Sequence, residues 1–237
     1  MYIESTNSTN DLLRQDMAVG EYWTTYQTAG RGQQGNVWES EKGKNILLSM
    51  AVRPGIETVE PIPVRDGFRL TMAVSLGICE ALDTIGVQAE VKWPNDIYVG
   101  DKKICGTLIE SSIEGRFFAY NIVGIGLNVN QRKWVGDAPN PTSIALETGK
   151  ETELIAFHET LMESLQKRVR AWRDEQLKEQ YMARLYRREG LFAYRETATG
   201  KRLEARIKDI TDEGCLVLET ADGSVQTYLL KQIQYIL

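Results

Sequence analysis

The segment from Gln27 to Trp38 carries residue types with which a loop could hold an anionic small molecule. Glycines stand at positions 30, 32 and 35, and Arg31 lies between the first two. Glycine accepts positive φ and has no Cβ, so such a loop can bring backbone N–H groups against a ligand. Arg31 adds a permanent charge with a planar set of donors suited to a carboxylate or a phosphate. Trp38 adds a flat surface on which a ring could stack.

Two well-known nucleotide motifs share this glycine spacing, and the surrounding sequence argues against both. Gly30-x-Gly32-x-x-Gly35 matches the dinucleotide-binding fingerprint, but that fingerprint needs a helix directly after the glycines. A strand-like segment, 46–52, follows here instead. Adding Val37 gives the spacing of the kinase glycine loop, yet the chain has neither the His-Arg-Asp nor the Asp-Phe-Gly motif that kinase chemistry requires.

Four further clusters combine charged or amide side chains with glycine or proline. They are Lys92-Trp93-Pro94-Asn95-Asp96, the segment 102–110 with Lys103 and Gly106, the segment 123–130 with Gly124, Gly126 and Asn128, and the segment 141–144. Taken singly, each has an ordinary structural explanation as a polar turn, a solvated lysine pair or a tight place in a strand. Ser-Thr-Asn occurs twice near the start, and Ser8, Thr9 or Asn10 is also a natural N-cap for the helical pattern that starts at Asp11.

The elements that must position these clusters predict an α+β fold. Strand patterns cover residues 21–26, 46–52, 88–99, 102–110 and 116–129, and helical patterns cover 66–85 and 151–188. Strands that follow one another through short turns favour a mixed or antiparallel sheet over alternating βαβ units. His158, the single histidine, falls on the apolar face of the second helical segment, which favours a packed structural residue over a catalytic one.

The pattern changes after Gly190. Short strand patterns at 203–210, 215–220, 225–229 and 233–236 are separated by polar turns that contain glycine. Closely spaced strands of this kind predict a small β-barrel. We therefore place a domain boundary between residues 187 and 188, which gives domains of 1–187 and 188–237.

Composition and charge limit the classes of function. The net charge of −5 over 237 residues argues against nucleic-acid binding, which needs a basic face. No apolar run approaches the ~18 residues that span a bilayer, and the first residues lack the features of a signal peptide. The three cysteines are far apart and predict neither a disulfide framework nor a metal site. We therefore expect a cytoplasmic protein with no membrane or nucleic-acid partner.

In this order the motifs closely resemble those of the biotin protein ligases, the biotin–[acetyl-CoA-carboxylase] ligases. The shared motifs are Ser-Thr-Asn, Gly-Arg-Gly-x-x-Gly-x-x-Trp, Lys-Trp-Pro-Asn-Asp, Lys-x-x-Gly-x-Leu-x-Glu and Gly-Ile-Gly-x-Asn-Val-Asn, which span residues 8–130. The tail, 207–223, is similar to the SH3-like C-terminal domain of that family. The resemblance implies a class II synthetase-like catalytic domain, with helices packed on one side of its mixed sheet, followed by the SH3-like barrel.

The resemblance implies a two-step acyl transfer with ATP and Mg²⁺. Biotin and ATP first give biotinyl-5′-AMP and pyrophosphate, and a lysine of the biotin carboxyl carrier protein or domain then displaces AMP. The first step brings a carboxylate to a polyanion, so fixed cations are needed. The residues that match the catalytic ones of the family are Lys103, Arg31 and Asp96. Asp96 would orient the lysine, help to hold Mg²⁺ or assist the incoming amine.

Binding roles follow from the same resemblance. Biotin contacts fall on Ser8, Thr9, Asn10, Gln27, Gly30, Arg31, Gly32, Gln33, Lys103, Gly124 and Gly126. Contacts with ATP or the adenylate fall on Arg31, Trp38, Lys92, Asn95 and Asn128, with Trp38 stacking on the adenylate and Asn128 reading adenine. The second Ser-Thr-Asn copy is preferred because Leu13 stands at the third position after Asn10, as in the family.

Two departures from the family pattern matter. Gln33 stands where an arginine often helps to retain the adenylate, so we expect this chain to release its intermediate more readily. The chain also begins almost at Ser-Thr-Asn, which leads us to expect a monofunctional ligase without the helix-turn-helix of repressor-type members. A homodimer is compatible with the pattern. The alternatives are a lipoate or octanoate ligase of the same fold and a non-catalytic sensor of biotin or adenylate.

Overall fold

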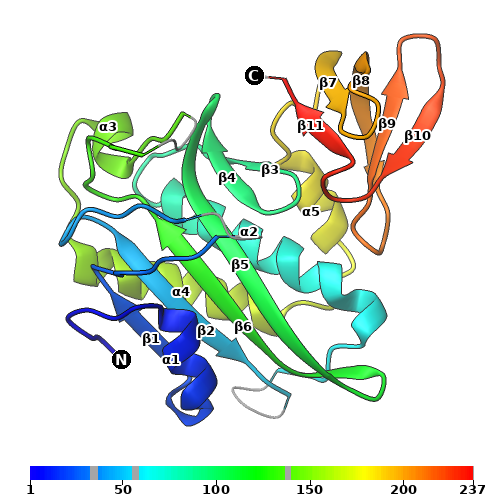
Figure 1. Ribbon diagram of the computed structural model, residues 1–237. Helices are drawn as coiled ribbons and strands as arrows, with labels where there is room; N and C mark the ends of the chain where they lie inside the picture. The colour runs from blue at the N-terminus through cyan, green and yellow to red at the C-terminus, as the bar shows by residue number, and fades with distance from the viewer. Residues whose placement is uncertain (33–36, 55–58, 137–139, 237) are drawn as a thin grey trace.

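The centre of the molecule is a six-stranded sheet with the strand order β1-β2-β6-β5-β4-β3 (Figure 1). A computed structural model describes residues 1–32, 37–54, 59–136 and 140–236. Neighbouring strands of this sheet pair antiparallel. The strands are β1 (Glu21–Thr24), β2 (Ile46–Val52), β3 (Glu90–Lys92), β4 (Asp96–Val99), β5 (Lys102–Glu114) and β6 (Phe117–Leu127). The α+β class is confirmed, and parallel pairing is found in the described part of the chain only at isolated bridges such as Thr6↔Gln27.

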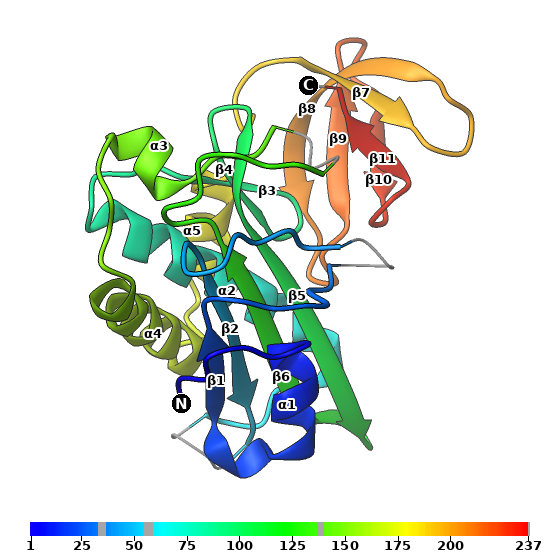
Figure 2. The same ribbon diagram turned by 60° about the vertical axis from the view of Figure 1, so that its left-hand side comes forward.

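The two long helices pack on one face of this sheet (Figures 1 and 2). They are α2 (Gly67–Asp83) and α4 (Leu154–Arg170), which pack against each other and bury their apolar stripes. The short helix α1 (Thr9–Gln15) lies on the opposite face, against β1, β2 and β6. The smaller elements are η1 (Met17–Val19), η3 (Val64–Asp66) and α3 (Ile144–Thr148). The α1 face is therefore free of long helices, and the polar clusters gather there.

The prediction of one continuous helix over 151–188 was wrong in its middle. The chain leaves the helix after Arg170 and resumes it in α5 (Leu177–Ala183). Arg69 of α2 donates from Nε to the Trp172 carbonyl at 3.0 Å and from Nη2 to the Asp174 carbonyl at 2.6 Å. These carbonyls are satisfied by a side chain from another element, so the break is stabilised by a tertiary contact that helical periodicity does not reveal.

The C-terminal region forms a separate antiparallel sheet with the order β10-β9-β8-β7-β11 (Figure 1). Its strands are β7 (Phe192–Glu196), β8 (Arg202–Ile210), β9 (Leu216–Thr220), β10 (Val225–Tyr228) and β11 (Ile233–Tyr235). The four expected strands are present, and β7 was missed. No pairing joins the outer strands β10 and β11 among the described residues, so closure into a barrel stays a prediction, as does the domain boundary at 187/188.

The Lys-Trp-Pro-Asn-Asp segment connects the two sheets. Trp93 is buried and donates from Nε1 to the Gly214 carbonyl, in the turn before β9, at 2.9 Å. The Tyr181 hydroxyl of α5 donates to the Pro94 carbonyl at 2.6 Å. The segment that carries Lys92 and Asp96 is therefore held from behind by the C-terminal sheet and by α5.

His158 has the structural role that its position on the helix indicated. Its ring stacks on Trp23 with 4.4 Å between centroids, and only 6% of the residue is exposed. Burial lowers the pKa of His158, and the nearby Glu21 carboxylate partly opposes that shift. Among the residues described, no helix is both long and apolar enough to cross a membrane.

Candidate active site

A hollow of about 860 Å³ lies on the α1 face of the large sheet. Its walls include α1, the segments on both sides of residues 33–36, and the facing parts of β2, β5 and β6. The predicted site residues that line it are Ser8, Thr9, Asn10, Gln27, Gly30, Arg31, Gly32, Trp38, Lys92, Asp96, Lys103, Gly124, Gly126 and Asn128. The predicted residue Gln33 lies outside the described residues. The fold therefore brings clusters from five separate parts of the sequence to one cavity.

At the first turn of α1 the side chains that line the cavity are uncharged, namely those of Ser8, Thr9 and Asn10. Ser8 is the N-cap residue, but its side chain makes no capping hydrogen bond, so its hydroxyl is left to the cavity that it lines. Gln27 Oε1 accepts hydrogen bonds from the Thr9 backbone N–H at 2.7 Å and from Thr9 Oγ1 at 3.1 Å. These two hydrogen bonds fix the Gln27 amide through its oxygen. Helix capping therefore does not explain why Ser8 and Thr9 are polar, because neither side chain caps α1.

Ser49 of β2 does not line the cavity but supports two residues that do, and sequence analysis missed it. Its Oγ lies 2.7 Å from Thr9 Oγ1 and 2.5 Å from Asn10 Oδ1, and it is fully buried. Asn10 Nδ2 donates to Glu110 Oε2 at 2.6 Å. A Cβ at Gly124 would clash with Asn10 Oδ1, so only glycine leaves room for this arrangement. The signal in the sequence was weak, because Ser49 is one polar residue in an otherwise apolar strand pattern.

The ring of Trp38 packs against the backbone of two glycines, Gly106 and Gly126. Gly106 of β5 and Gly126 of β6 are neighbours in the sheet. A Cβ added at Gly126 would be 2.5 Å from Trp38 Cε2, and one at Gly106 would be 2.8 Å from Trp38 Cζ3. The indole Nε1 is buried without a hydrogen-bond partner. The two glycines thus make room for a flat ring, which here is that of Trp38 itself.

Among the described residues of the cavity wall three are cations: Lys92 and Lys103 lie at the end away from α1, and Arg31 lies beside α1. Two of the three are paired with carboxylates. Lys103 Nζ lies 2.6 Å from Asp96 Oδ1, and Arg31 Nη2 lies 2.5 Å from Asp11 Oδ1. Lys92 donates to the Tyr98 hydroxyl at 3.0 Å. Burial lowers the pKa of Lys92, with Lys103 and Arg187 acting in the same direction and Asp96 opposing them. The end of the cavity away from α1 therefore carries two lysines, one of which is paired with the Asp96 carboxylate.

Of the two asparagines predicted to contact ATP, Asn128 lines the cavity and Asn95 does not. Asn128 lines the cavity and donates from Nδ2 to the Thr142 carbonyl at 2.9 Å, while its Oδ1 is buried without a partner. An unpaired acceptor of this kind suits an amino group of a ligand. Asn95 does not line the cavity, and its amide donates to the Thr107 carbonyl at 3.2 Å. Asn95 therefore stabilises the turn behind Asp96.

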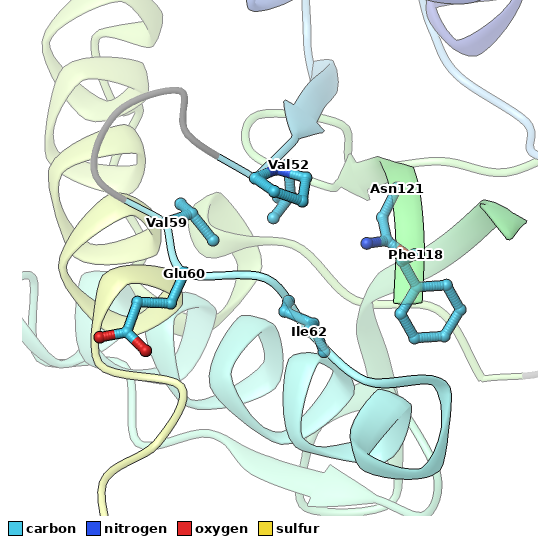
Figure 3. Close-up of a pocket in the computed structure, with 7 residues that line it drawn as sticks. Val52, Val59, Glu60, Ile62, Phe118 and Asn121 are labelled. Atoms are coloured by element: carbon cyan, nitrogen blue, oxygen red, sulfur yellow. The ribbon is translucent and has the colours of Figure 1, made fainter. Parts of the chain in front are cut away.

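A second depression lies away from these residues. It is lined by apolar side chains of β2, of residues 59–62 and of Phe118, with Glu60 and Asn121 beside them (Figure 3). It contains no cluster of groups that could bind a charged ligand. Over the described ranges, no three His, Cys, Asp or Glu side chains are grouped as they would be to hold a metal ion by themselves.

The fold and this cavity define a member of a known enzyme family. Residues 2–128 match the biotin/lipoate A/B protein ligase family, and the chain belongs to it. Its homologues are biotin protein ligases. The biotin–[acetyl-CoA-carboxylase] ligase of Mycobacterium tuberculosis is 30% identical over 209 residues, which cover 84% of this chain and 73% of that protein. The bifunctional ligase/repressor BirA of Bacillus spizizenii is 30% identical over 214 residues, which cover 85% of this chain and 62% of that protein.

Solved structures show the same fold. The biotin protein ligase from Aquifex aeolicus in complex with biotin and ATP superposes with a TM-score of 0.80 at 22% identity, covering 100% of this chain and 98% of that one. The ligase from Leishmania major in complex with biotinyl-5-AMP gives a TM-score of 0.65 at 26% identity, covering 96% and 97%. The predicted biotin ligase fold is thus confirmed over nearly the whole chain.

Proposed function

We propose that this protein is an ATP-dependent biotin protein ligase that forms biotinyl-5′-AMP and then biotinylates a lysine of a biotin carboxyl carrier protein or domain. The observation that carries the proposal is the division of one cavity into an uncharged hydrogen-bonding end and a cationic end. Biotin has the same division, because its ring system carries a neutral ureido group and its chain ends in a carboxylate. Relatives that are named or solved as biotin ligases support the same assignment.

The uncharged end would hold the ureido ring. Ser8, Thr9, Asn10 and Gln27 offer hydroxyl and amide groups. Ser49 fixes the orientation of Thr9 and Asn10. Neutral groups are suited to a neutral ligand, because no buried charge has to lose its hydration. Gly106 and Gly126 make room for the Trp38 ring, beside which the apolar chain of biotin would lie.

The cationic end would carry the first chemical step. The biotin carboxylate attacks the α-phosphorus of ATP, the new acyl–phosphate bond forms, and the bond to pyrophosphate breaks. Lys103 and Arg31 would reduce the repulsion between the carboxylate and the phosphates and would stabilise the charge that develops on the phosphoryl oxygens. Lys92 would bind the phosphates, and the free Oδ1 of Asn128 would accept a hydrogen bond from the adenine amino group.

Asp96 fits the Mg²⁺ that accompanies ATP. Mg²⁺ prefers oxygen ligands and is usually held by one or two carboxylates together with phosphates and water. Of the acidic side chains among the described residues of the cavity wall, Glu39 already accepts backbone N–H groups from Val135 and Gly136, which leaves Asp96. The ion would supply charge neutralisation at the phosphates.

The second step transfers the acyl group to the carrier. The neutral lysine amine attacks the biotinyl carbonyl, the C–N bond forms, AMP leaves, and the amine loses a proton. Asp96 would accept that proton or orient Lys103, to which it is ion-paired. Enclosure of the mixed anhydride by the cavity would limit its hydrolysis. The proposal also locates the protein in the cytoplasm, where its second substrate, ATP, is available.

The proposal is tested by incubating the protein with ATP, Mg²⁺, biotin and a carrier domain, with each omitted in turn. We expect pyrophosphate release that requires biotin and ATP, and a biotinylated carrier lysine in the mass spectrum only in the complete mixture. Pyrophosphate release with lipoate or octanoate but not with biotin would assign the alternative ligase activity. Biotin binding without pyrophosphate release would identify a sensor and refute the enzyme.

A further inference from the structure

Lys92 differs from the other two cations of the cavity in its partners. It ends β3 opposite Asp96, but the Asp96 carboxylate lies against Lys103. No carboxylate in the described part of the chain lies within ion-pair distance of the Lys92 ammonium group. Its partners are the Tyr98 hydroxyl at 3.0 Å and two aromatic rings, those of Tyr98 at 4.6 Å and Tyr235 at 5.4 Å from Nζ to the centroid. The charge of Lys92 is therefore held in place without being neutralised.

Tyr235 reaches this place from the other sheet. It belongs to β11, at the end of the chain, and its ring contacts those of Tyr186 and Tyr194 at 6.1 and 5.0 Å between centroids. Arg187 Nη1 donates to the carbonyl of the next residue, Ile236, at 2.8 Å and fixes the end of the strand. The Tyr235 hydroxyl is buried without a hydrogen-bond partner. The contact with Lys92 thus comes from the face of the ring, and the hydroxyl contributes nothing to it.

We propose that Tyr235 is a positioning residue for Lys92, through which the C-terminal sheet completes the phosphate-binding end of the cavity. This inference rests on the proposed function. An aromatic face attracts an ammonium group by its quadrupole and leaves the positive charge available to an anion. A carboxylate in the same position would compete with the phosphates of ATP. Without the ring, the flexible lysine chain would extend towards water, as lysines at partly exposed sites do.

The test compares variants at two tyrosines of the same sheet. Tyr235→Met keeps an apolar side chain but removes the ring face, and Tyr235→Phe keeps the face and removes the unpartnered hydroxyl. Tyr228→Met is the control, because Tyr228 is a buried tyrosine of the same sheet whose hydroxyl bonds Glu196 and whose ring does not contact Lys92. Biotin-dependent ATP–pyrophosphate exchange should show the KM for ATP raised about three- to tenfold in Tyr235→Met only, with kcat and the KM for biotin nearly unchanged.

Two further measurements separate positioning from folding. Phenylalanine with a fully fluorinated ring at position 235 keeps the shape and weakens the attraction for a cation, so it should raise the KM for ATP relative to Tyr235→Phe even if Tyr235→Met unfolds. In a Lys92→Met background, Tyr235→Met should cause no additional rise, because its effect passes through the lysine. Equal KM values for ATP in all variants, or additive effects of the two substitutions, would overturn the inference. Absence of biotin-dependent exchange in the unaltered protein would refute the proposed function instead.

Discussion

The two ends of the cavity are prepared for their ligands in opposite ways. At the uncharged end, Thr9, Asn10 and Ser49 are at most 5% exposed and bind one another through short hydrogen bonds. At the cationic end, Lys103 is partly exposed and already holds Asp96, and Arg31, beside α1, is also exposed and holds Asp11. A preorganised polar site loses little freedom when it binds, whereas a paired cation must give up or share its partner. We infer that the uncharged end supplies specificity and that the cationic end adjusts when substrate arrives.

The largest expected effect is at the cationic end. Lys103→Ala should reduce adenylate formation about 100-fold or more while leaving the fold intact, because it removes a fixed charge from the reacting groups. Lys102→Ala is the matched control, since Lys102 is exposed and does not line the cavity. The measurement is biotin-dependent pyrophosphate release together with the melting temperature. Normal release by Lys103→Ala would refute the catalytic assignment.

A smaller effect is expected at the uncharged end. Ser49→Ala removes the hydroxyl that holds Thr9 and Asn10, and should raise the KM for biotin about fivefold, which corresponds to one lost hydrogen bond of about 1 kcal/mol. The KM for ATP should not change. Ser75→Ala is the control, because Ser75 Oγ is equally buried but has no partner. A change in the KM for ATP that equals the change for biotin would show that the two ends are not independent.

The pH dependence should also distinguish the two ends. Lys92 has a pKa below its ordinary value of 10.5, mainly because of burial, so its charge is lost at a lower pH than that of an exposed lysine. The KM for ATP should therefore rise with pH in the alkaline range, while the KM for biotin stays flat. In the same range the unfolded chain binds more protons at this residue, so the contribution of Lys92 to the free energy of unfolding rises with pH. Lys92→Met should remove both trends.

The smallest effect is expected from Asp11, which holds Arg31 at 2.5 Å in a partly exposed ion pair. Asp11→Asn should lower the KM for biotin or ATP by about two- to threefold, because exposed pairs of this kind are weak and Arg31 would be released to the ligand. Asp16→Asn, at the exposed end of the same helix, controls for the change in net charge. A higher KM in Asp11→Asn would mean that the pair holds Arg31 in its productive position.

The fold was predictable where the pattern is local. Period-two and period-3.6 patterns placed most strands of both sheets and the two long helices. The break between α4 and α5 was not predictable, because Arg69 from a distant helix stabilises it. Strand β7 was missed because its five residues alternate weakly and its pairing with β8 and β11 comes from elsewhere in the chain.

The sequence by itself determined the family, since the order and spacing of its motifs match that family. The same motifs predicted roles for the glycine loop, Lys103 and Asp96. Only the tertiary structure decided which partner each group has. It paired Arg31 with Asp11, placed Ser49 under the first turn of α1 and packed Trp38 against Gly106 and Gly126. It also brought Tyr235 from the last strand to Lys92, which lies 143 positions earlier in the chain. A side chain's type is a local property, but its partner depends on how distant segments pack, and motif spacing contains no information about that packing.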